Sequence, residues 1–275
     1  MSEVERGHGD AYAPPVVAVR VRDAGVTKLR RAGFPTFVLS VLAGAFIGLG
    51  ALFYVVVVTD AALGFGVTRL LGGLAFSLGL ILVVVAGAEL FTGNVLVAMA
   101  WASRLVRTGE VVRHWSLVFV GNAVGALGTV ALVWLGEIHT FGAGAVGASL
   151  SAIGEHKTSL SVVALVALGT LCNALVCLAV WLAQAARSVT DKVLAIVFPI
   201  TAFVAVGAEH SIANLFLLPW AWLVGGLDAG FASATLVNLA AVTVGNLLGG
   251  TVLVAAVYWL AYLRPGADDA SGHEP

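Results

Sequence analysis

Three ionisable residues lie inside long apolar stretches of this chain of 275 residues: Glu89, Glu209 and His210. An ionisable side chain in a membrane-spanning segment is costly, so each of them is a candidate functional group. Glu89 and Glu209 occupy equivalent places in a repeated pattern, which favours a structural role for both. A carboxylate at a helix break can accept backbone N–H groups and offset the positive end of the next helix. His210 has Leu90 as its counterpart, so the repeat does not explain it. Its imidazole can hydrogen-bond to a passing anion or exchange a proton with it.

Two short patterns occur twice in the chain with nearly the same spacing. The residues 87–94 match 207–214, and 121–126 match 245–250. Asn94 and Asn214 fall beside the glutamates and are therefore expected to be structural residues at the breaks. The matches indicate two repeats of three helices each, and an odd number of membrane crossings separates them. The halves are therefore expected to be inverted, with helices two and five broken where they line a central cavity.

The composition predicts the setting of these motifs. Hydrophobic residues make up 60% of the chain, charged residues 11%, and the mean hydropathy is +1.03. A soluble domain has roughly 25% charged residues, so we expect an all-α membrane protein with one six-helix domain. Its predicted spans are 36–58, 70–101, 115–135, 159–186, 193–220 and 231–263, each long enough to cross a bilayer. These runs lack the alternation of a β-barrel.

Several functional classes find no support in the sequence. A net charge of −1 without a basic patch argues against a nucleic-acid partner. Cys172 and Cys177 lack the number and spacing of a disulfide framework or a metal cage. No phosphate-binding loop, dinucleotide fingerprint or nucleophile motif occurs. We therefore expect no enzyme activity, no metal and no cofactor.

The distribution of lysine and arginine predicts the orientation in the cell membrane. If the spans alternate, twelve of these residues fall on one side, and only Arg69 and Lys157 fall on the other. By the positive-inside rule both termini are cytoplasmic. The expected organisation is a cytoplasmic tail (1–33), a channel domain (34–264) and a second cytoplasmic tail (265–275).

Strings in every span except the first resemble those of the formate/nitrite transporter family. Besides the two glycine–asparagine patterns at 121–126 and 245–250, they are Phe76-Ser-Leu-Gly-Leu80, Ala88-Glu-Leu-Phe-Thr92, Asn173-Ala-Leu-Val-Cys-Leu-Ala-Val-Trp181 and Glu209-His-Ser-Ile-Ala-Asn214. The last string, in the fifth predicted span, is the most specific of them. The resemblance implies an aquaporin-like fold and a homopentamer with one pore in each protomer. It also implies conduction of small weak-acid anions, with protons as partners.

The resemblance also implies roles for individual residues. His210 corresponds to the central histidine, with Thr92 and Asn173 as its hydrogen-bond neighbours. Lys157 corresponds to a cation in the external vestibule. The hydrophobic constrictions correspond to Phe76, Leu80, Phe91 and Phe203, and a mobile segment corresponds to roughly 78–90.

The choice of solute stays open at this point. The aromatic constriction residues favour formate. Gly93, Asn94 and Ala208 differ from the residues usual in formate channels, and the short loop between spans five and six resembles that of the nitrite branch. Hydrosulfide channels of the same family are a further alternative. A neutral-solute channel of the aquaglyceroporin type would carry paired Asn-Pro-Ala motifs, but Val95 and Leu215 follow the asparagines. A membrane anchor for a redox enzyme would need haem-ligating histidine pairs, and we expect only one histidine within the membrane.

Overall fold

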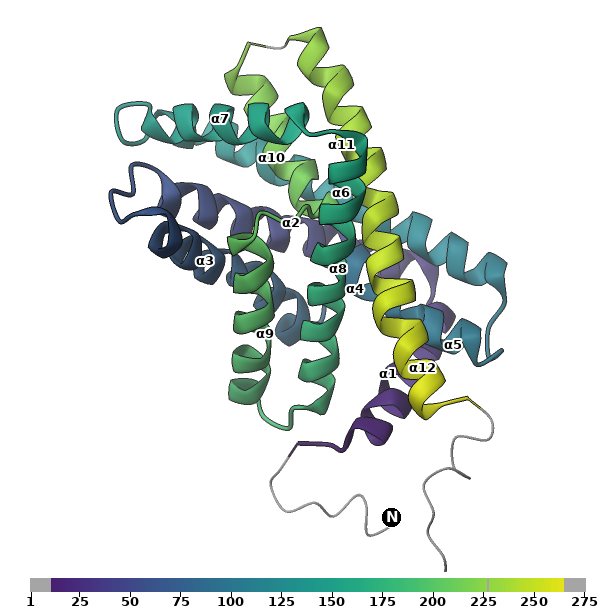
Figure 1. The fold of residues 1–275 in the computed structure, drawn as a ribbon. Helices are drawn as coiled ribbons and strands as arrows, with labels where there is room; N and C mark the ends of the chain where they lie inside the picture. Colours follow the sequence, from purple (N-terminus) through teal and green to yellow (C-terminus); the bar gives the residue numbers. More distant parts are fainter. Residues whose placement is uncertain (1–10, 227, 265–275) are drawn as a thin grey trace, which may run out of the picture.

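The structure, a computed structural model, describes residues 11–226 and 228–264, and within these ranges the regular elements are all helical (Figure 1). In chain order they are α1 (Pro14–Arg30), α2 (Gly33–Val58), α3 (Phe65–Ala86), α4 (Phe91–Asn94), η2 (Val95–Val97), α5 (Ala98–Ala102), α6 (Thr108–Leu135), η3 (Ile138–Thr140), α7 (Ala145–Ser159), α8 (Val162–Ala185), α9 (Val189–Ala205), α10 (Ser211–Val224), α11 (Ala229–Leu248), η4 (Gly249–Ala256, a π-helix) and α12 (Val257–Tyr262).

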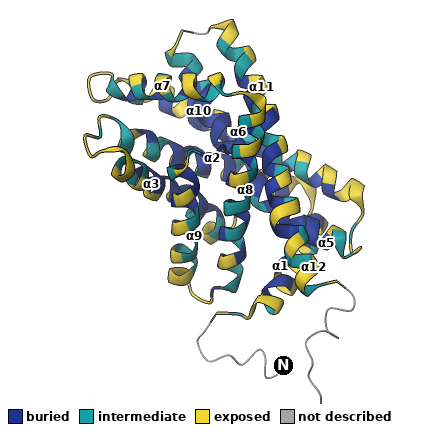
Figure 2. Cartoon of the chain, in the orientation of Figure 1, coloured by how far each residue is buried: buried dark blue, intermediate teal, exposed yellow. Residues whose placement is uncertain are grey.

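Five helices in the described part of the chain are long and apolar enough to cross a membrane. They are α2, α3, α6, α8 and the continuous helix Ala229–Tyr262. The shortest has 22 residues, or roughly 33 Å at 1.5 Å per residue, against a hydrocarbon core of about 30 Å. Figure 2 shows exposed residues on the outward faces of these helices and buried ones between them. Large apolar side chains such as Leu132 (72% exposed) and Leu236 (70%) lie on those outward faces. The chain is thus a multi-pass membrane protein.

The two halves of the chain pack in the same way. Helix α2 packs against α3 and α6, and α8 packs against α9 and α11. Glycine permits close approach at equivalent positions in the two halves. A Cβ atom at Gly125 would overlap the carbonyl oxygen of Val41, and one at Gly249 would overlap that of Thr170. Alanine at either position would force the helix pair apart.

Helices α1 and α7 had no counterpart among the predicted spans. Each precedes the first long helix of its half, and Figure 1 shows them at opposite ends of the molecule. Helix α1 lies in the segment assigned to the first tail (1–33), yet it packs against η2, α5 and α8 and buries Val17 and Ala18 completely. Helix α7 packs against α10 and α11. The tail predicted at 265–275 lies outside the described residues.

Candidate functional site

The candidate site lies where two apolar helices stop and new ones begin. Helix α3 ends at Ala86, and α9 ends at Ala205. Gly87 (φ +85°) and Gly207 (φ +76°) then adopt the left-handed conformation that favours glycine. After a few extended residues the chain becomes helical again at Phe91 and at Ser211. The first of these gaps falls at the end of the segment 78–90, most of which is helical.

Two asparagines cap the helices that begin after these gaps. Asn122 Oδ1 accepts the N–H of Phe91 at 2.8 Å, and Asn246 Oδ1 accepts that of Ser211 at 2.9 Å. From the sequence, Glu89 and Glu209 were predicted to accept such N–H groups. The structure assigns this task to neutral amides, because the carboxylates are held by cations instead.

The side-chain NH2 group of each asparagine links two backbone segments by hydrogen bonds. The side-chain NH2 of Asn122 donates to the carbonyl oxygens of Ser40 and Glu89, at 2.7 and 3.0 Å. That of Asn246 donates to the carbonyl oxygens of Gly169 and Glu209, at 2.8 and 3.0 Å. Both asparagines recur in the repeated sequence pattern, but no role was predicted for them from the sequence.

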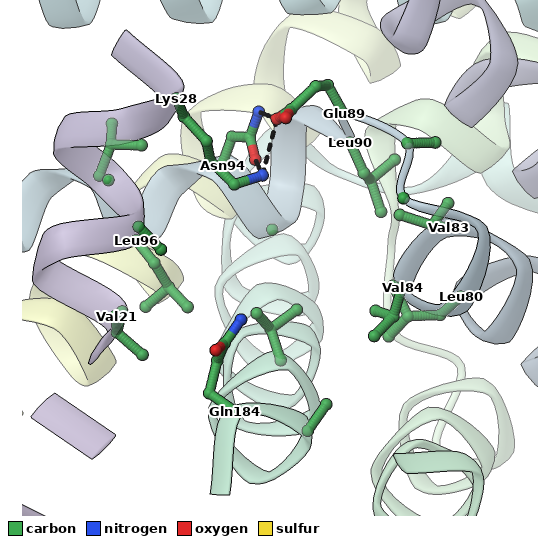
Figure 3. A pocket seen from close by; sticks show the side chains of 18 of the residues that line it. Val21, Lys28, Leu80, Val83, Val84, Glu89, Leu90, Asn94, Leu96 and Gln184 are labelled. Carbon is green, nitrogen blue, oxygen red and sulfur yellow. Dashed lines mark hydrogen bonds and ion pairs between the residues drawn. The ribbon is translucent and has the colours of Figure 1, made fainter. Parts of the chain in front are cut away.

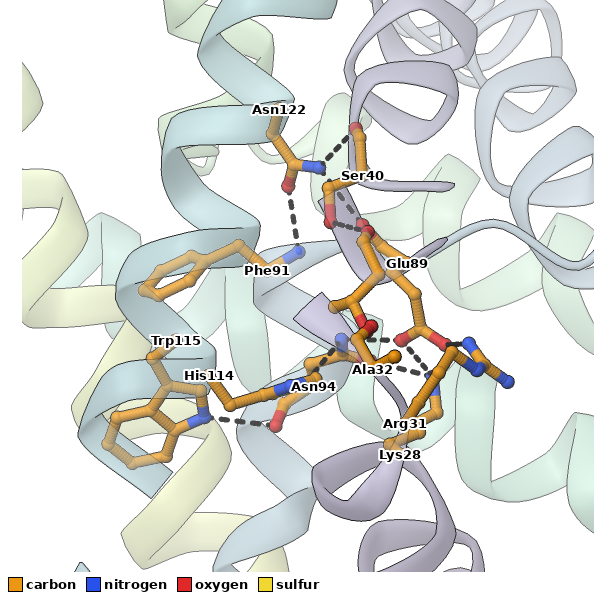
Figure 4. Close-up of polar contacts among 11 residues, drawn as sticks. Lys28, Arg31, Ala32, Ser40, Glu89, Phe91, Asn94, His114, Trp115 and Asn122 are labelled. Atoms are coloured by element: carbon orange, nitrogen blue, oxygen red, sulfur yellow. Dashed lines mark hydrogen bonds and ion pairs between the residues drawn. The ribbon is translucent and has the colours of Figure 1, made fainter. Parts of the chain in front are cut away.

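Glu89 is 3% exposed and is surrounded by donors (Figure 4). Lys28 Nζ lies 2.7 Å from Oε2, Arg31 forms an ion pair with Oε1, and Asn94 Nδ2 donates to Oε2 at 2.7 Å. Asn94 also contacts Nε2 of the buried His114 at 3.1 Å. Sequence reasoning missed Lys28, Arg31 and His114, since it counted the first two only as topology signals. His114 was missed because the third predicted span starts at residue 115, although α6 already begins at Thr108.

Glu209, which is 2% exposed, has an equivalent but smaller network. Lys157 Nζ donates to its Oε1 at 2.8 Å, and Asn214 Nδ2 donates to its Oε2 at 2.7 Å. Asn214 also donates to Asn238, which takes the place that His114 has in the first half. Lys157 had been predicted as a vestibule cation, and its ammonium group is paired with this buried carboxylate. Lys28 and Lys157 are therefore equivalent partners of equivalent glutamates.

His210 joins the two interrupted regions. Its Nε2 lies 2.9 Å from the hydroxyl of Thr92, and both side chains are buried. Its Nδ1 accepts the N–H of Ala213 at 3.0 Å and so caps α10. A backbone N–H can only donate, so the neutral ring carries its proton on Nε2 and donates it to Thr92. The Thr92 hydroxyl hydrogen is then free to point toward a solute.

Two cavities of similar size adjoin the interrupted regions, one beside each region. The α1 cavity, of about 260 Å³, is lined by α1 and by residues 87–90, 93 and 94 (Figure 3). The α7 cavity, of about 290 Å³, is lined by α7 and by the equivalent residues 207–210, 213 and 214. His210 belongs to the α7 cavity. In the α1 cavity its place is taken by Leu90.

The four predicted constriction residues lie in three different places. Phe76 and Phe203 meet edge to face with centroids 5.4 Å apart, and both lie beside the His210 ring and line the α7 cavity. Leu80 lines the α1 cavity. Phe91 does not line either cavity, because its ring packs against Phe119 with centroids 5.2 Å apart.

Asn173, the other predicted neighbour of the histidine, makes no hydrogen bond to His210 among the described residues. It is fully buried, and its NH2 donates to the carbonyl oxygen of Asn246 at 2.6 Å. In the described part of the chain its Oδ1 has no hydrogen-bond partner. The same part of the chain contains no cluster of three His, Cys, Asp or Glu side chains that could hold a metal.

Comparison with known proteins gives consistent matches over nearly the whole chain. A sequence model described as formate/nitrite transporter matches residues 15–260. The chain is 39% identical over 273 residues to the "Formate channel FocA" of Escherichia coli strain K12, covering 93% of this chain and 96% of that protein. It is 34% identical over 271 residues to the protein of the same name from Haemophilus influenzae, covering 92% and 95%.

Two solved structures are similar to this one. One, named "Pentameric formate channel with formate bound", has 40% sequence identity and a TM-score of 0.75, covering 85% of this chain and 98% of its own. The other, an "FNT family ion channel", has 29% identity and a TM-score of 0.79, covering 89% and 98%.

Proposed function

The chain belongs to the formate/nitrite transporter family, and from that membership we propose that it conducts small monovalent weak-acid anions, with formate as the favoured solute. The family is one of transporters and channels, not of enzymes. The names of these relatives favour formate, since the matched proteins of Escherichia coli and Haemophilus influenzae are both called formate channels. Nitrite and hydrosulfide are the alternatives that the same site would admit.

The observation that carries this proposal is the hydrogen bond between His210, which lines the α7 cavity, and Thr92, whose neighbour Gly93 lines the α1 cavity. A bare anion entering a low-dielectric constriction faces an idealised cost of order 20 kcal/mol. The same solute crosses far more easily as a neutral acid. A donor pair at the centre of the path stabilises the anion there and is a source of the proton that neutralises it.

The mechanism that we propose uses His210 as a proton relay. The Thr92 hydroxyl donates to the anion, and the His210 Nε2–H supports that hydroxyl. The imidazole can take up a second proton from the α7 cavity at Nδ1 once Nδ1 releases the N–H of Ala213. The imidazolium then gives its Nε2 proton to the Thr92 oxygen while the hydroxyl gives its own proton to the anion, which leaves the ring neutral and the solute as the acid. The neutral acid then passes the apolar side chains Phe76, Phe203 and Leu80, which exclude hydrated ions.

We further propose six membrane crossings in two inverted repeats, as in an aquaporin-like fold. Helix α3 with Phe91–Ala102 would form the second crossing, and α9 with α10 the fifth. In this arrangement the α1 cavity faces the cytoplasm together with both termini, and the α7 cavity faces outward. One similar structure is named a pentamer, which supports a homopentamer with one pore in each protomer.

Cysteine labelling tests this orientation. With Cys172 and Cys177 replaced by alanine, single cysteines at Ser2 and at Ser271 are expected to react only after the membrane is permeabilised. The reason is the excess of lysine and arginine on that side. A cysteine at Ala143, in the α6–α7 connection, is the matched control and is expected to react in intact cells. Labelling of Ser2Cys or Ser271Cys by an impermeant reagent in intact cells contradicts the orientation.

Flux into proteoliposomes tests the function itself. Formate, nitrite, hydrosulfide and glycerol are compared at pH 5.5 and 7.5, with internal pH recorded. Formate is expected to enter fastest and with protons, so its rate rises as the external pH falls. Glycerol flux equal to that of protein-free liposomes is expected. A glycerol flux equal to the formate flux favours the neutral-solute channel. A formate flux no faster than that of protein-free liposomes refutes the proposal.

A further inference from the structure

The Lys, Arg and Glu side chains that line the two cavities give each cavity the same net charge. In the α1 cavity they are Lys28, Arg31 and Glu89, which leave one surplus positive charge. In the α7 cavity they are Arg69, Lys157 and Glu209, which again leave one. Lys157 and Glu209 are paired at 2.8 Å. The surplus charge of the α7 cavity therefore resides on Arg69.

Among the described residues, the Arg69 guanidinium has no ion-pair partner, and one of its N–H groups has no acceptor. None of their carboxylates forms an ion pair with its guanidinium, and its Nε–H group is buried without a hydrogen-bond acceptor. A buried donor without an acceptor is costly. A ligand or water that supplies an acceptor would remove that cost.

The guanidinium is held against the interrupted region of the second half. A Cβ atom built on Gly207 would lie 3.0 Å from Nη2, and the Cζ atom lies 5.4 Å from the centre of the Phe65 ring. Gly207 precedes His210 by three residues. Arg69 thus stands at the wall of the cavity that leads to the histidine.

We propose that Arg69 forms an anion-binding subsite in the α7 cavity, selective for small planar oxyanions of the carboxylate type. The fork of guanidinium donors matches such an anion better than an ammonium group does. Lys157 then serves chiefly to neutralise Glu209, and Arg69 concentrates the solute ahead of His210. This inference rests on the proposed function, because it assigns a residue to the capture step of the same path.

Uptake from the α7 side at low ionic strength tests the subsite. Arg69→Gln is expected to raise the half-saturation concentration for formate about five-fold with little change in maximal rate. In 0.5 M salt this difference is expected to shrink below about two-fold, because the Debye length falls to about 4 Å. Arg104→Gln, an exposed arginine between α5 and α6, is the matched control and should behave as the wild type.

The outcomes separate this inference from the proposed function. If the wild type conducts formate and assembled Arg69→Gln has an unchanged half-saturation concentration at low salt, the subsite does not exist. If the wild type moves no formate, the proposed function fails instead. If the Arg69→Gln protein does not assemble, the subsite is tested by chemical modification of the wild-type protein instead. Formate is expected to slow modification of Arg69 by an arginine-specific glyoxal, read by peptide mass, and unchanged modification overturns the subsite.

Discussion

Replacing His210 with asparagine is expected to separate two activities that the wild type couples. Proton-linked formate uptake should fall at least ten-fold, because an amide cannot take up or release a proton near neutral pH. Electrogenic anion leak should persist or rise, since the amide still solvates the ion. Asparagine is also a good N-cap residue, so the bond that His210 now makes to the Ala213 N–H has a replacement. Internal pH and membrane current are recorded on the same reconstituted protein.

The control for this experiment is His139→Asn, which changes a histidine that stacks on Trp134 outside both cavities. It should leave both activities unchanged. A histidine with a purely structural role predicts a different pattern, in which assembly is lost and both activities fall together. If assembled His210→Asn protein acidifies vesicles with formate at the wild-type rate, the relay role is wrong.

Replacing Asn246 with alanine is expected to cause a large loss of stability. The change removes an acceptor from the Ser211 N–H and two donors from the carbonyl oxygens of Gly169 and Glu209. These groups are buried, and an unsatisfied buried group costs about 1–3 kcal/mol in water-soluble proteins, with smaller values measured in membranes. We expect the free energy of unfolding in mixed micelles to fall by about 3 kcal/mol. Asn122→Ala should have a similar effect, because its contacts are the same in the other half.

Thr243→Ala is the matched control for this substitution. Thr243 lies on the same helix and makes one hydrogen bond, to the carbonyl oxygen of Leu239 within its own helix. Such a bond adds little to stability, so a loss below about 1 kcal/mol is expected. If Asn246→Ala costs no more than Thr243→Ala, the capping role of the asparagine is refuted.

The long apolar helices could be read from the sequence because bilayer thickness dictates their length. The first predicted span, 36–58, lies within α2 (Gly33–Val58), and the fourth, 159–186, includes α8 (Val162–Ala185). The predicted helix boundaries are wrong where polar residues extend a helix beyond its apolar run. Helix α6 begins at Thr108, so His114 lies within it although hydropathy placed the residue outside.

The candidate site was only partly accessible to sequence reasoning. The repeat located Glu89, Glu209 and His210, because a duplicated pattern in apolar sequence reveals positions that hydropathy hides. It could not reveal their partners. Lys28 pairs with Glu89 across 61 residues because α1 folds back onto the bundle, and Lys157 pairs with Glu209 through α7. Neither helix is apolar enough to be recognised as a span, so a hydropathy reading treats both as connecting segments.

The equivalence of α1 and α7 has a practical consequence for protein engineering. A shortened chain that starts at Gly33, the first residue of α2, would look complete by hydropathy. It would lack Lys28 and Arg31, the two cations that pair with the Glu89 carboxylate. Breaking a buried ion pair from one side typically costs about 3–5 kcal/mol. Affinity tags and fusion partners are therefore better joined ahead of Pro14, so that α1 remains with the helices it packs against.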